Sequence, residues 1–283
     1  MTGTGTQADP FVPITLTEFI EAVGTSSAYV ALDRDIDAAE DPAYTGELTA
    51  PVGFAAAQVE GNGHFVRGVT VRAQNMIALT PISAHVLDLD LIAWAHKKTT
   101  QAPTFQGYNS RNYDTGFENC MFSVAVDAPC YGNRLMNHIK MERCSADIKY
   151  ISTDGAPGYA IDYCTIAYTT LRISGIWIGS VTSNVLLHDV AFPRSAVILH
   201  DPRVYDKAYL TYNVGWEYSY IAFVDIPQGI TGIQGSNFLA TGGVIVAIDD
   251  TGIPMTFDSA GAIRATLDQM KDEAWLASVG FLP

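Results

Sequence analysis

The sequence predicts an all-β fold, a single-stranded right-handed parallel β-helix (solenoid), and two observations lead to this prediction. The first is a weak repeat of about two dozen residues, in which a short β-type run carries one small apolar position between polar neighbours. The second is that these runs follow one another without long helical patterns between them, which excludes an α/β barrel or a doubly wound sheet. The aligned apolar positions are Val71, Leu91, Cys120, Cys144, Cys164, Val190, Val214 and Phe238, with steps of 20, 29, 24, 20, 26, 24 and 24 residues.

The composition of the chain agrees with one long body and excludes some partners. The chain has 283 residues, of which 48% are hydrophobic, so it can bury an extensive core. Its formal net charge is −14, which repels phosphate, so we expect no nucleic acid partner. No apolar stretch reaches the roughly 18 residues of a membrane span, and Met1 to Pro10 lacks the pattern of a secretory signal. We therefore expect no membrane partner and no export signal.

Residues 1–27 are expected to form a leader and a short capping helix. The helix is predicted over Leu16 to Val23, with Thr15 as N-cap and Glu18 placed three residues later, as in a capping box. An open solenoid end exposes unpaired strand edges, and this helix is suited to cover them. Its apolar face is Leu16, Phe19, Ile20 and Val23.

Residues 28–256 are expected to form the parallel β-helix. Period-2 alternation in the run from Phe117 to Val126 places Cys120 and Phe122 on its inner face. A second interior column is predicted, and a phase slip after Ile166 indicates a bulge. That column is Phe122, Ala146, Ile166, Phe192 and Trp216.

Three of the four cysteines occupy the repeat position, and we interpret them as small core side chains. Parallel coils about 4.8 Å apart would stack Cys120, Cys144 and Cys164 pointing the same way, which is poor geometry for a disulfide. A metal site made of three thiolates is the alternative, but the chain has no CxxC spacing to support it.

Residues 257–283 are expected to form a C-terminal helix. Ser259 is its predicted cap and Gly280 its predicted end. The apolar positions follow a heptad-like spacing, so the helix should dock on the solenoid or on a partner. These positions are Ile263, Leu267, Met270, Ala274 and Ala277.

The sequence gives weak evidence for catalysis. Outward carboxylate pairs are expected at Asp88/Asp90, Glu118/Asp127 and Glu142/Asp147, and glycan cleavage would need two carboxylates about 5 to 10 Å apart. A solvated acidic face is the favoured interpretation of these acids. Zinc-binding, dinucleotide-binding and GxSxG motifs are absent from the sequence. We predict no catalytic residue, metal site or cofactor.

Two long connections, residues 96–116 and 200–210, are the expected surfaces for contact with a glycan or a partner, since long loops on a solenoid often carry binding. The aromatic run Trp216, Tyr218 and Tyr220 could stack on sugars. Its alternation places it with Val214, however, so burial is the favoured interpretation. The candidate contact residues in the loops are Phe105, Tyr108, Tyr113, Tyr205 and Tyr209.

The start of the chain resembles that of right-handed β-helix proteins from bacterial and phage surfaces, within a pectate-lyase-like superfamily. The resemblance rests on Gly3-Thr-Gly-Thr6, Asp9-Pro-Phe11, Thr15 with its short helix, and Asp35-Ile-Asp37. With its degenerate coils, the chain resembles a bacteriophage virion component of the tailspike, fibre or spike kind.

This resemblance implies a structural component of a bacteriophage virion that assembles with other virion proteins and is commonly a homotrimer. Made in the host cytoplasm, such a protein would reside in the virion and contact host-surface glycan. The alternative is a phage-borne polysaccharide depolymerase, a lyase or glycosidase, on the same fold. A third class, an exported bacterial adhesin, would require the signal that is not found.

Overall fold

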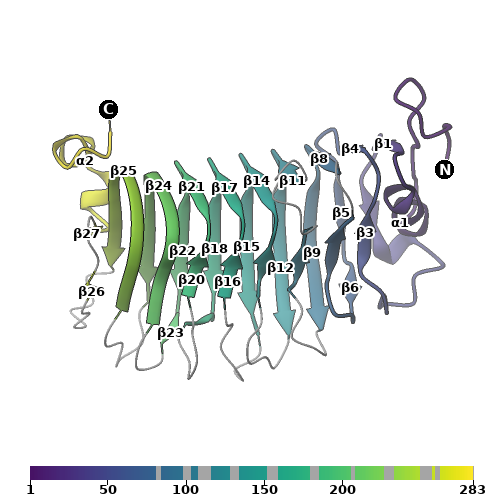
Figure 1. Cartoon of the computed structure of the whole chain (residues 1–283). Coiled ribbons are helices and arrows are strands. Elements are labelled where there is room, and N and C mark those ends of the chain that lie inside the picture. Colours follow the sequence, from purple (N-terminus) through teal and green to yellow (C-terminus); the bar gives the residue numbers. More distant parts are fainter. Residues whose placement is uncertain are drawn as a thin grey trace.

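The computed structural model is a right-handed parallel β-solenoid with one helix near the N-terminus and one at the C-terminus, which confirms the predicted fold class (Figure 1). The residues that it describes are 1–80, 84–97, 103–107, 116–127, 134–151, 159–178, 185–204, 208–225, 233–248, 257–258 and 262–282. No helix among these residues is long and apolar enough to cross a bilayer.

Each coil contributes strands to three parallel faces, which we name A, B and C in chain order. Face A contains β3 (Val52–Phe54), β7 (Ile77–Leu79), β10 (Phe105–Gln106), β13 (Met136–Asn137), β16 (Tyr159–Asp162) and β20 (Val185–His188). Face B contains β1 (Tyr29–Ala31), β4 (Gln58–Glu60), β8 (His85–Leu87), β11 (Gly116–Glu118), β14 (Lys140–Glu142), β17 (Thr165–Ala167) and β21 (Ala191–Pro193). Face C contains β2 (Ile36–Asp37), β5 (Phe65–Arg67), β9 (Asp90–Lys97), β12 (Met121–Asp127), β15 (Ser145–Tyr150), β18 (Thr170–Ser174) and β22 (Ala196–His200).

Two long strands extend this stack. β24 (Ala208–Val224) pairs in turn with β20, β21 and β22, and so passes through all three faces. β25 (Ile233–Ile248) follows β24 over the same course. The remaining short strands are β6 (Thr70–Val71), β19 (Trp177–Ile178), β23 (Arg203–Val204), β26 (Phe257–Asp258) and β27 (Ala262–Thr266).

Single residues with left-handed backbone form the corners between faces. At the corner between faces B and C, φ is 53° at Asn119 and Arg143 and 51° at Tyr168. One residue in this conformation redirects an extended chain, and it costs an L-residue more than it costs glycine. The residue after each corner residue is buried, except at Asn62, which is followed by the exposed Gly63. The B–C corner is formed by Asn62, Asp88, Asn119, Arg143, Tyr168, Arg194 and Tyr218, and the A–B corner by His138, Tyr163 and Asp189.

The three repeat cysteines are buried and free, as expected, but they lie in two columns rather than one. Cys120 and Cys144 follow the B–C corner, whereas Cys164 follows Tyr163 at the A–B corner. The sequence alignment moved from one corner to the other at the 20-residue step between Cys144 and Cys164, because both corners are followed by small buried side chains. The true successor of Cys144 is Thr169, whose hydroxyl accepts a hydrogen bond from the Cys144 amide (3.1 Å).

The predicted second column is wrong for the same reason. Phe122 and Ala146 are in register with each other and continue on face C to Leu171. Ile166 instead pairs with Met141 on face B. The phase slip after Ile166 is the ordinary B–C corner residue Tyr168, not a bulge.

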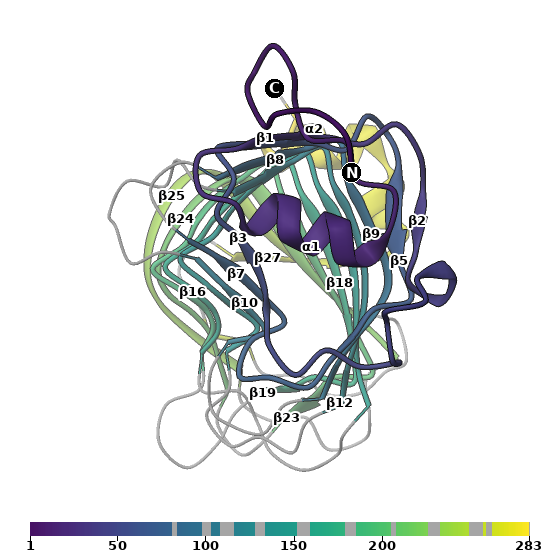
Figure 2. The same cartoon turned by 90° about the vertical axis from the view of Figure 1, so that its right-hand side faces the viewer.

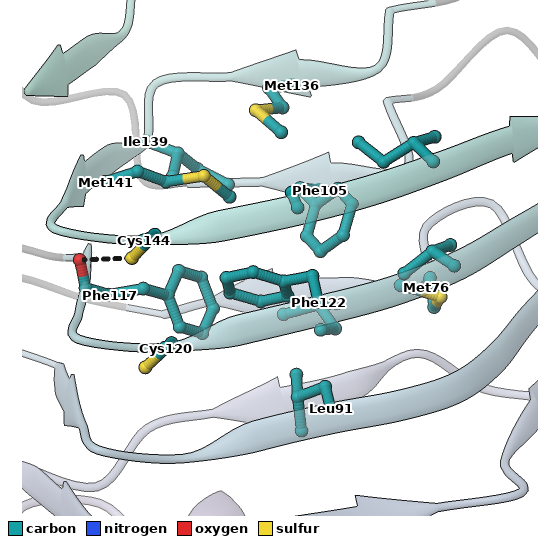
Figure 3. Close-up of a cluster of buried hydrophobic side chains, with 14 of the residues drawn as sticks. Met76, Leu91, Phe105, Phe117, Cys120, Phe122, Met136, Ile139, Met141 and Cys144 are labelled. Carbon is teal, nitrogen blue, oxygen red and sulfur yellow. Dashed lines mark hydrogen bonds between the residues drawn. The ribbon is translucent and has the colours of Figure 1, made fainter. Parts of the chain in front are cut away.

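Aromatic rings fill the interior between the faces (Figure 3). The rings of Phe117 and Phe122 meet edge to face at 5.0 Å, and those of Phe105 and Phe122 at 5.6 Å. The Cys144 thiol donates to the Phe117 carbonyl at 3.4 Å. Phe105 was predicted to be a contact residue in a loop; this is wrong, because it lies in β10 with no exposed surface.

The N-terminal cap confirms the predicted helix. α1 (Leu16–Gly24) crosses the open end of the first coils, as Figure 2 shows. The Thr15 hydroxyl accepts from the Glu18 amide (3.2 Å), and the Glu18 carboxylate accepts from the Ile14 amide (2.9 Å). The buried face of the helix consists of Leu16, Phe19, Ala22 and Val23, and Ile20 is partly buried beside it.

The C-terminal prediction is wrong over most of its length. Ile263 lies in β27, which pairs with β25, so the solenoid continues past the expected boundary at residue 256. A 3₁₀ turn, η2 (Gln269–Lys271), follows, and the helix α2 is short (Glu273–Ser278). The backbone of β27 forms strand hydrogen bonds with β25, whereas a short helix of this heptad-like pattern would be only marginally stable by itself.

The residues after β27, which we call the C-terminal strap (267–282), pack on the outside of face C. Leu276 is buried there against Ile245 and Ala265. The partly buried side chains around this small outer core are Tyr220, Met270, Trp275, Val279 and Phe281.

Candidate functional site

A hollow of about 320 Å³ opens on the outer surface at the B–C corner, towards the C-terminal end of the solenoid. Three successive coils and the end of the C-terminal strap form its walls. We call it the aromatic hollow. It is lined by Tyr168, Thr170, Arg194, Ser195, Ala196, Tyr218, Tyr220, Phe281 and Leu282.

The solenoid register brings these side chains together. Tyr168, Arg194 and Tyr218 are the corner residues of consecutive coils, with φ of 51°, 47° and 47°, so their side chains project outward. Two positions later the chain is on face C. There Thr170, Ala196 and Tyr220 are aligned in one outward column.

A row of buried hydroxyls, which we call the hydroxyl ladder, lies directly beneath the hollow. The Ser195 hydroxyl accepts from the Thr169 amide at 3.1 Å, and the Ser219 hydroxyl accepts from the Ser195 amide at 3.0 Å. The Thr169 and Ser195 hydroxyls also donate to the carbonyls of Ala167 and Ile166, at 2.8 and 2.9 Å. The hydroxyls of the ladder thus hydrogen-bond to backbone groups at the B–C corners, and these bonds hold the floor of the hollow in place.

The walls of the hollow are aromatic and carry positive charge. The guanidinium carbon of Arg194 lies 5.5 Å from the centroid of the Tyr218 ring, within the range of a cation–π interaction. The Tyr220 ring meets Phe281 at 6.3 Å, and burial raises the pKa of the Tyr220 phenol. Tyr168 is 53% exposed, so its ring is available to a ligand. No carboxylate stands among the lining residues that the structure describes.

A second polar cluster, the Asp162 cluster, lies at the A–B corner on the other side of β17. The buried Asp162 carboxylate accepts from His188 Nδ1 at 2.8 Å through Oδ1. Its Oδ2 accepts from Arg134 Nε and Asn137 Nδ2, each at 3.0 Å. Because these donors come from β13, β20 and the segment before β13, the carboxylate ties three coils together.

The exposed edge of the Asp162 cluster is Tyr163. Its ring stacks on His138, with a centroid distance of 5.0 Å and an interplanar angle of 17°, and meets His188 edge to face at 5.5 Å. The Asp189 carboxylate raises the pKa of Tyr163, and burial lowers the pKa of His138. We interpret this cluster as structural, since its buried carboxylate is already paired on both oxygens.

The remaining predicted contact residues are Tyr108, Tyr113, Tyr205 and Tyr209. Tyr108, Tyr113 and Tyr205 lie outside the described residues. Tyr209 belongs to strand β24, paired with Val185 and Gln234, so the loop expected around it is shorter than predicted.

Part of the aromatic hollow was visible in the sequence and part was missed. Tyr218 and Tyr220 were singled out as sugar-stacking candidates, but burial on the side of Val214 was favoured. Neither lies on that side: Tyr218 is a corner residue, and Tyr220 is partly buried on the outside of face C. Tyr168, Arg194 and Phe281 were not considered. The spacing of 26 and 24 residues from Tyr168 to Arg194 to Tyr218 would have revealed two of them, had the corners been recognised.

Two of the predicted outward carboxylates, Glu118 and Glu142 from different predicted pairs, are neutralised by an arginine. Glu118 and Glu142 are in register, and both bind Arg143 Nη1, at 2.6 and 3.3 Å. Asp90 differs, because burial, reinforced by the Asp88 carboxylate, raises its pKa even though it accepts from the Met121 amide at 3.1 Å. In the described part of the chain, no group of three His, Cys, Asp or Glu side chains is arranged to hold a metal ion.

Comparisons with known proteins add little to the site. No family model matches the chain, and no curated protein matches it. Among solved structures, the chain is similar to a putative immunoglobulin A1 protease from Bacteroides ovatus, at 12% identity with a TM-score of 0.44, over 98% of this chain and 89% of that one.

Proposed function

We propose that this chain is a structural component of a bacteriophage virion that contacts host-surface glycan through the aromatic hollow. The observation that carries the glycan-binding part is the convergence of Tyr168, Tyr218 and Tyr220 with Arg194 in one hollow. The C–H faces of sugar rings pack on aromatic rings, while the hydroxyl groups take hydrogen bonds from polar neighbours. The volume of about 320 Å³ is at the lower end of ligand sites and suits one or two sugar units.

The virion part of the proposal rests on the resemblance of the N-terminal segment and on the shape of the solenoid. An elongated stack with a capped N-terminal end (Figures 1 and 2) is compatible with a rod-like element in a larger particle. The proposed partners are further copies of this chain, as a homotrimer, and other virion proteins. Light scattering coupled to size exclusion tests this: a trimer mass supports it, and a monomer at micromolar concentration contradicts it.

The glycan-binding part is tested by comparing two exposed corner tyrosines at either end of β17. Tyr168 and Tyr163 share φ of 51° and are 53% and 39% exposed. Binding of the wild type is first sought among oligosaccharides from host surfaces on an array and measured by titration calorimetry. Tyr168→Ala is expected to weaken binding about tenfold, since the apolar area that the ring would bury against a sugar is lost.

Tyr163→Ala is the matched control, because Tyr163 carries the same backbone strain but lies outside the hollow. Its affinity should equal that of the wild type. Equal losses in both variants, or no glycan bound by the wild type, would contradict the proposal.

Asp90 favours a second candidate function, the polysaccharide depolymerase. Burial and the nearby Asp88 carboxylate raise the pKa of Asp90, which meets one requirement of a general acid. The assay is release of reducing ends or unsaturated sugars from host capsule by the purified protein. Release that disappears in Asp90→Asn would establish this function, and the absence of release from any capsule that the protein binds would reject it.

A further inference from the structure

We propose that the aromatic hollow selects glycans that carry an acidic group, a carboxylate or a phosphate, through Arg194 assisted by Arg172. This inference rests on the glycan binding proposed above and specifies its ligand class. It starts from the charge of the protein: with 30 acidic and 16 basic residues, an unpaired arginine is unusual on this surface.

The described arginines divide by their partners. Neither Arg172 nor Arg194 has a carboxylate within ion-pair distance in the described ranges, and both are exposed. The arginines that do have a carboxylate partner are Arg34, Arg67, Arg72, Arg134 and Arg143. Arg172 and Arg194, which have none within these ranges, both lie near the hollow.

Arg143 makes this contrast sharper, because it occupies the same B–C corner column one coil before Tyr168. Its backbone has the same left-handed conformation, with φ of 53°. Its guanidinium, however, is held by Glu118 and Glu142. The corner column therefore carries a neutralised arginine outside the hollow and an available one inside it.

Arg194 is positioned to bind an anion. The Tyr218 ring lies within cation–π range of the guanidinium, whose N–H groups form a fork that matches two oxygens of a carboxylate or phosphate. Its own backbone amide is anchored to the Glu217 carbonyl at 2.6 Å. Pre-organisation of this kind lowers the entropy lost on binding.

Arg172 lies close to the hollow without lining it. It lies on β18 two residues after Thr170, and its positive charge acts on the Tyr220 phenol. An acidic sugar stacked between Tyr168 and Tyr220 would therefore lie near two positive groups. A neutral sugar in that place would leave both arginines without a partner.

The test uses pairs of probes that differ only in the acidic group. These are trigalacturonate and its methyl ester, sialyllactose and its methyl ester, and mannose 6-phosphate and mannose, with affinities measured by calorimetry. The wild type should bind at least one acidic member about tenfold more tightly than its neutral match, as charge-assisted hydrogen bonds are stronger. The third pair distinguishes phosphate from carboxylate as the recognised group.

Variants identify the residue responsible. Arg194→Gln should remove the preference, and Arg194→Lys should restore only part of it, because lysine keeps the charge and loses the fork. Arg172→Gln should reduce the preference by a smaller factor. Arg143→Gln is the matched control and should leave it unchanged.

The outcomes separate this inference from the proposed function. Equal affinity for the acidic and neutral members of every pair, with Tyr168→Ala still weakening both, overturns the acidic preference and leaves glycan binding standing. A preference that survives Arg194→Gln also overturns it. Failure to bind either member of any pair, together with an empty glycan array, overturns both proposals.

Discussion

At the scale of single residues, the position after each B–C corner decides how well the coils are joined. Apolar and thiol side chains occupy it in the first coils, at Leu89, Cys120 and Cys144, and hydroxyls occupy it further on. From Thr169 onward the side-chain hydroxyl accepts a hydrogen bond from a backbone amide of the preceding coil. One buried oxygen thus satisfies a donor that would otherwise be unpaired. The floor of the aromatic hollow depends on these bonds.

Thr169→Val tests the hydroxyl ladder. The substitution keeps the shape of the side chain but leaves the buried Cys144 amide without its acceptor, so we expect a loss of about 1–3 kcal/mol in the free energy of unfolding. Thr165→Val, on the outward side of β17, is the matched control and should change it by less than about 0.5 kcal/mol. Urea unfolding measures both. Equal effects of the two variants would show that the ladder bonds contribute nothing specific.

The buried thiols give a second prediction at this scale. Burial raises the pKa of Cys164 to about 12, and the contact in which the Cys120 thiol donates to Cys144, together with burial, raises the pKa of Cys120. The same contact lowers the pKa of Cys144, but its sulfur is buried away from the reagent. Since the reactive form is an accessible thiolate, all three groups should be inert at pH 8. In a Cys130→Ser background, Ellman's reagent should detect no thiol in the native protein and three after unfolding. Rapid reaction of the native protein would contradict the burial of this core.

At the scale of elements, the two ends of the chain differ in how much the sequence could predict. The helix α1 was found correctly because its start carries a local signal, the Thr15 cap, and its apolar face is continuous. The C-terminal helix was placed about ten residues too early, because the apolar positions from Ile263 onward fit a strand and a helix equally well. Only the presence of β25 beside them decides between the two, and that information is not local.

Asp41 joins the N-terminal cap to the first coils. Its carboxylate accepts from the amides of Thr17 (2.6 Å) and Ala43 (2.9 Å), and these bonds, above all that from Thr17, hold its pKa below the usual range despite burial. A lowered folded pKa means that the stabilisation is complete above pH about 4 and is lost as the pH falls through the folded pKa. The cap should therefore loosen at acid pH.

Asp41→Asn should speed amide exchange in α1 at pH 7 by about fivefold or more, since hydrogen bonds to a charged group are lost. At pH values below the lowered pKa of Asp41, where the carboxyl group becomes protonated, variant and wild type should converge. Hydrogen exchange followed by mass spectrometry measures this, and the exposed Glu40→Gln is the control. A difference between Asp41→Asn and the wild type that does not change with pH would contradict the role of the carboxylate charge.

The C-terminal strap gives a prediction that connects packing with binding. Leu276 holds the strap on face C, and the strap carries Phe281 into the hollow. Leu276→Ala should release the strap and weaken glycan binding several-fold, while the strands of the solenoid stay intact by circular dichroism. Ala277→Ser, on the exposed side of α2, is the control. Unchanged affinity in Leu276→Ala would show that the strap is not part of the site.

At the scale of the whole molecule, the repeat predicted the fold but not the composition of the site. Any stack of coils of this period buries one side chain after each corner, so the fold class follows from the pattern even when the alignment slips between Cys144 and Cys164. The aromatic hollow does not follow from it, since its members are chosen by the register between coils. Tyr168, Arg194, Tyr218 and Phe281 are distant in sequence, and a shift of one position would turn each of them away.

The register along face B is therefore the central claim, and electron–electron resonance distances between spin labels measure it most directly. Glu60, Glu118 and Glu217 are outward residues of one column, so Glu60→Cys/Glu217→Cys spans six steps and Glu118→Cys/Glu217→Cys spans four. In a Cys130→Ser background, steps of about 4.8 Å predict separations of about 29 Å and 19 Å. A difference near 10 Å between the two pairs confirms the stack. Equal distances in the two pairs would contradict it. So would distances that exceed the predicted values by more than the length of the spin-label side chains.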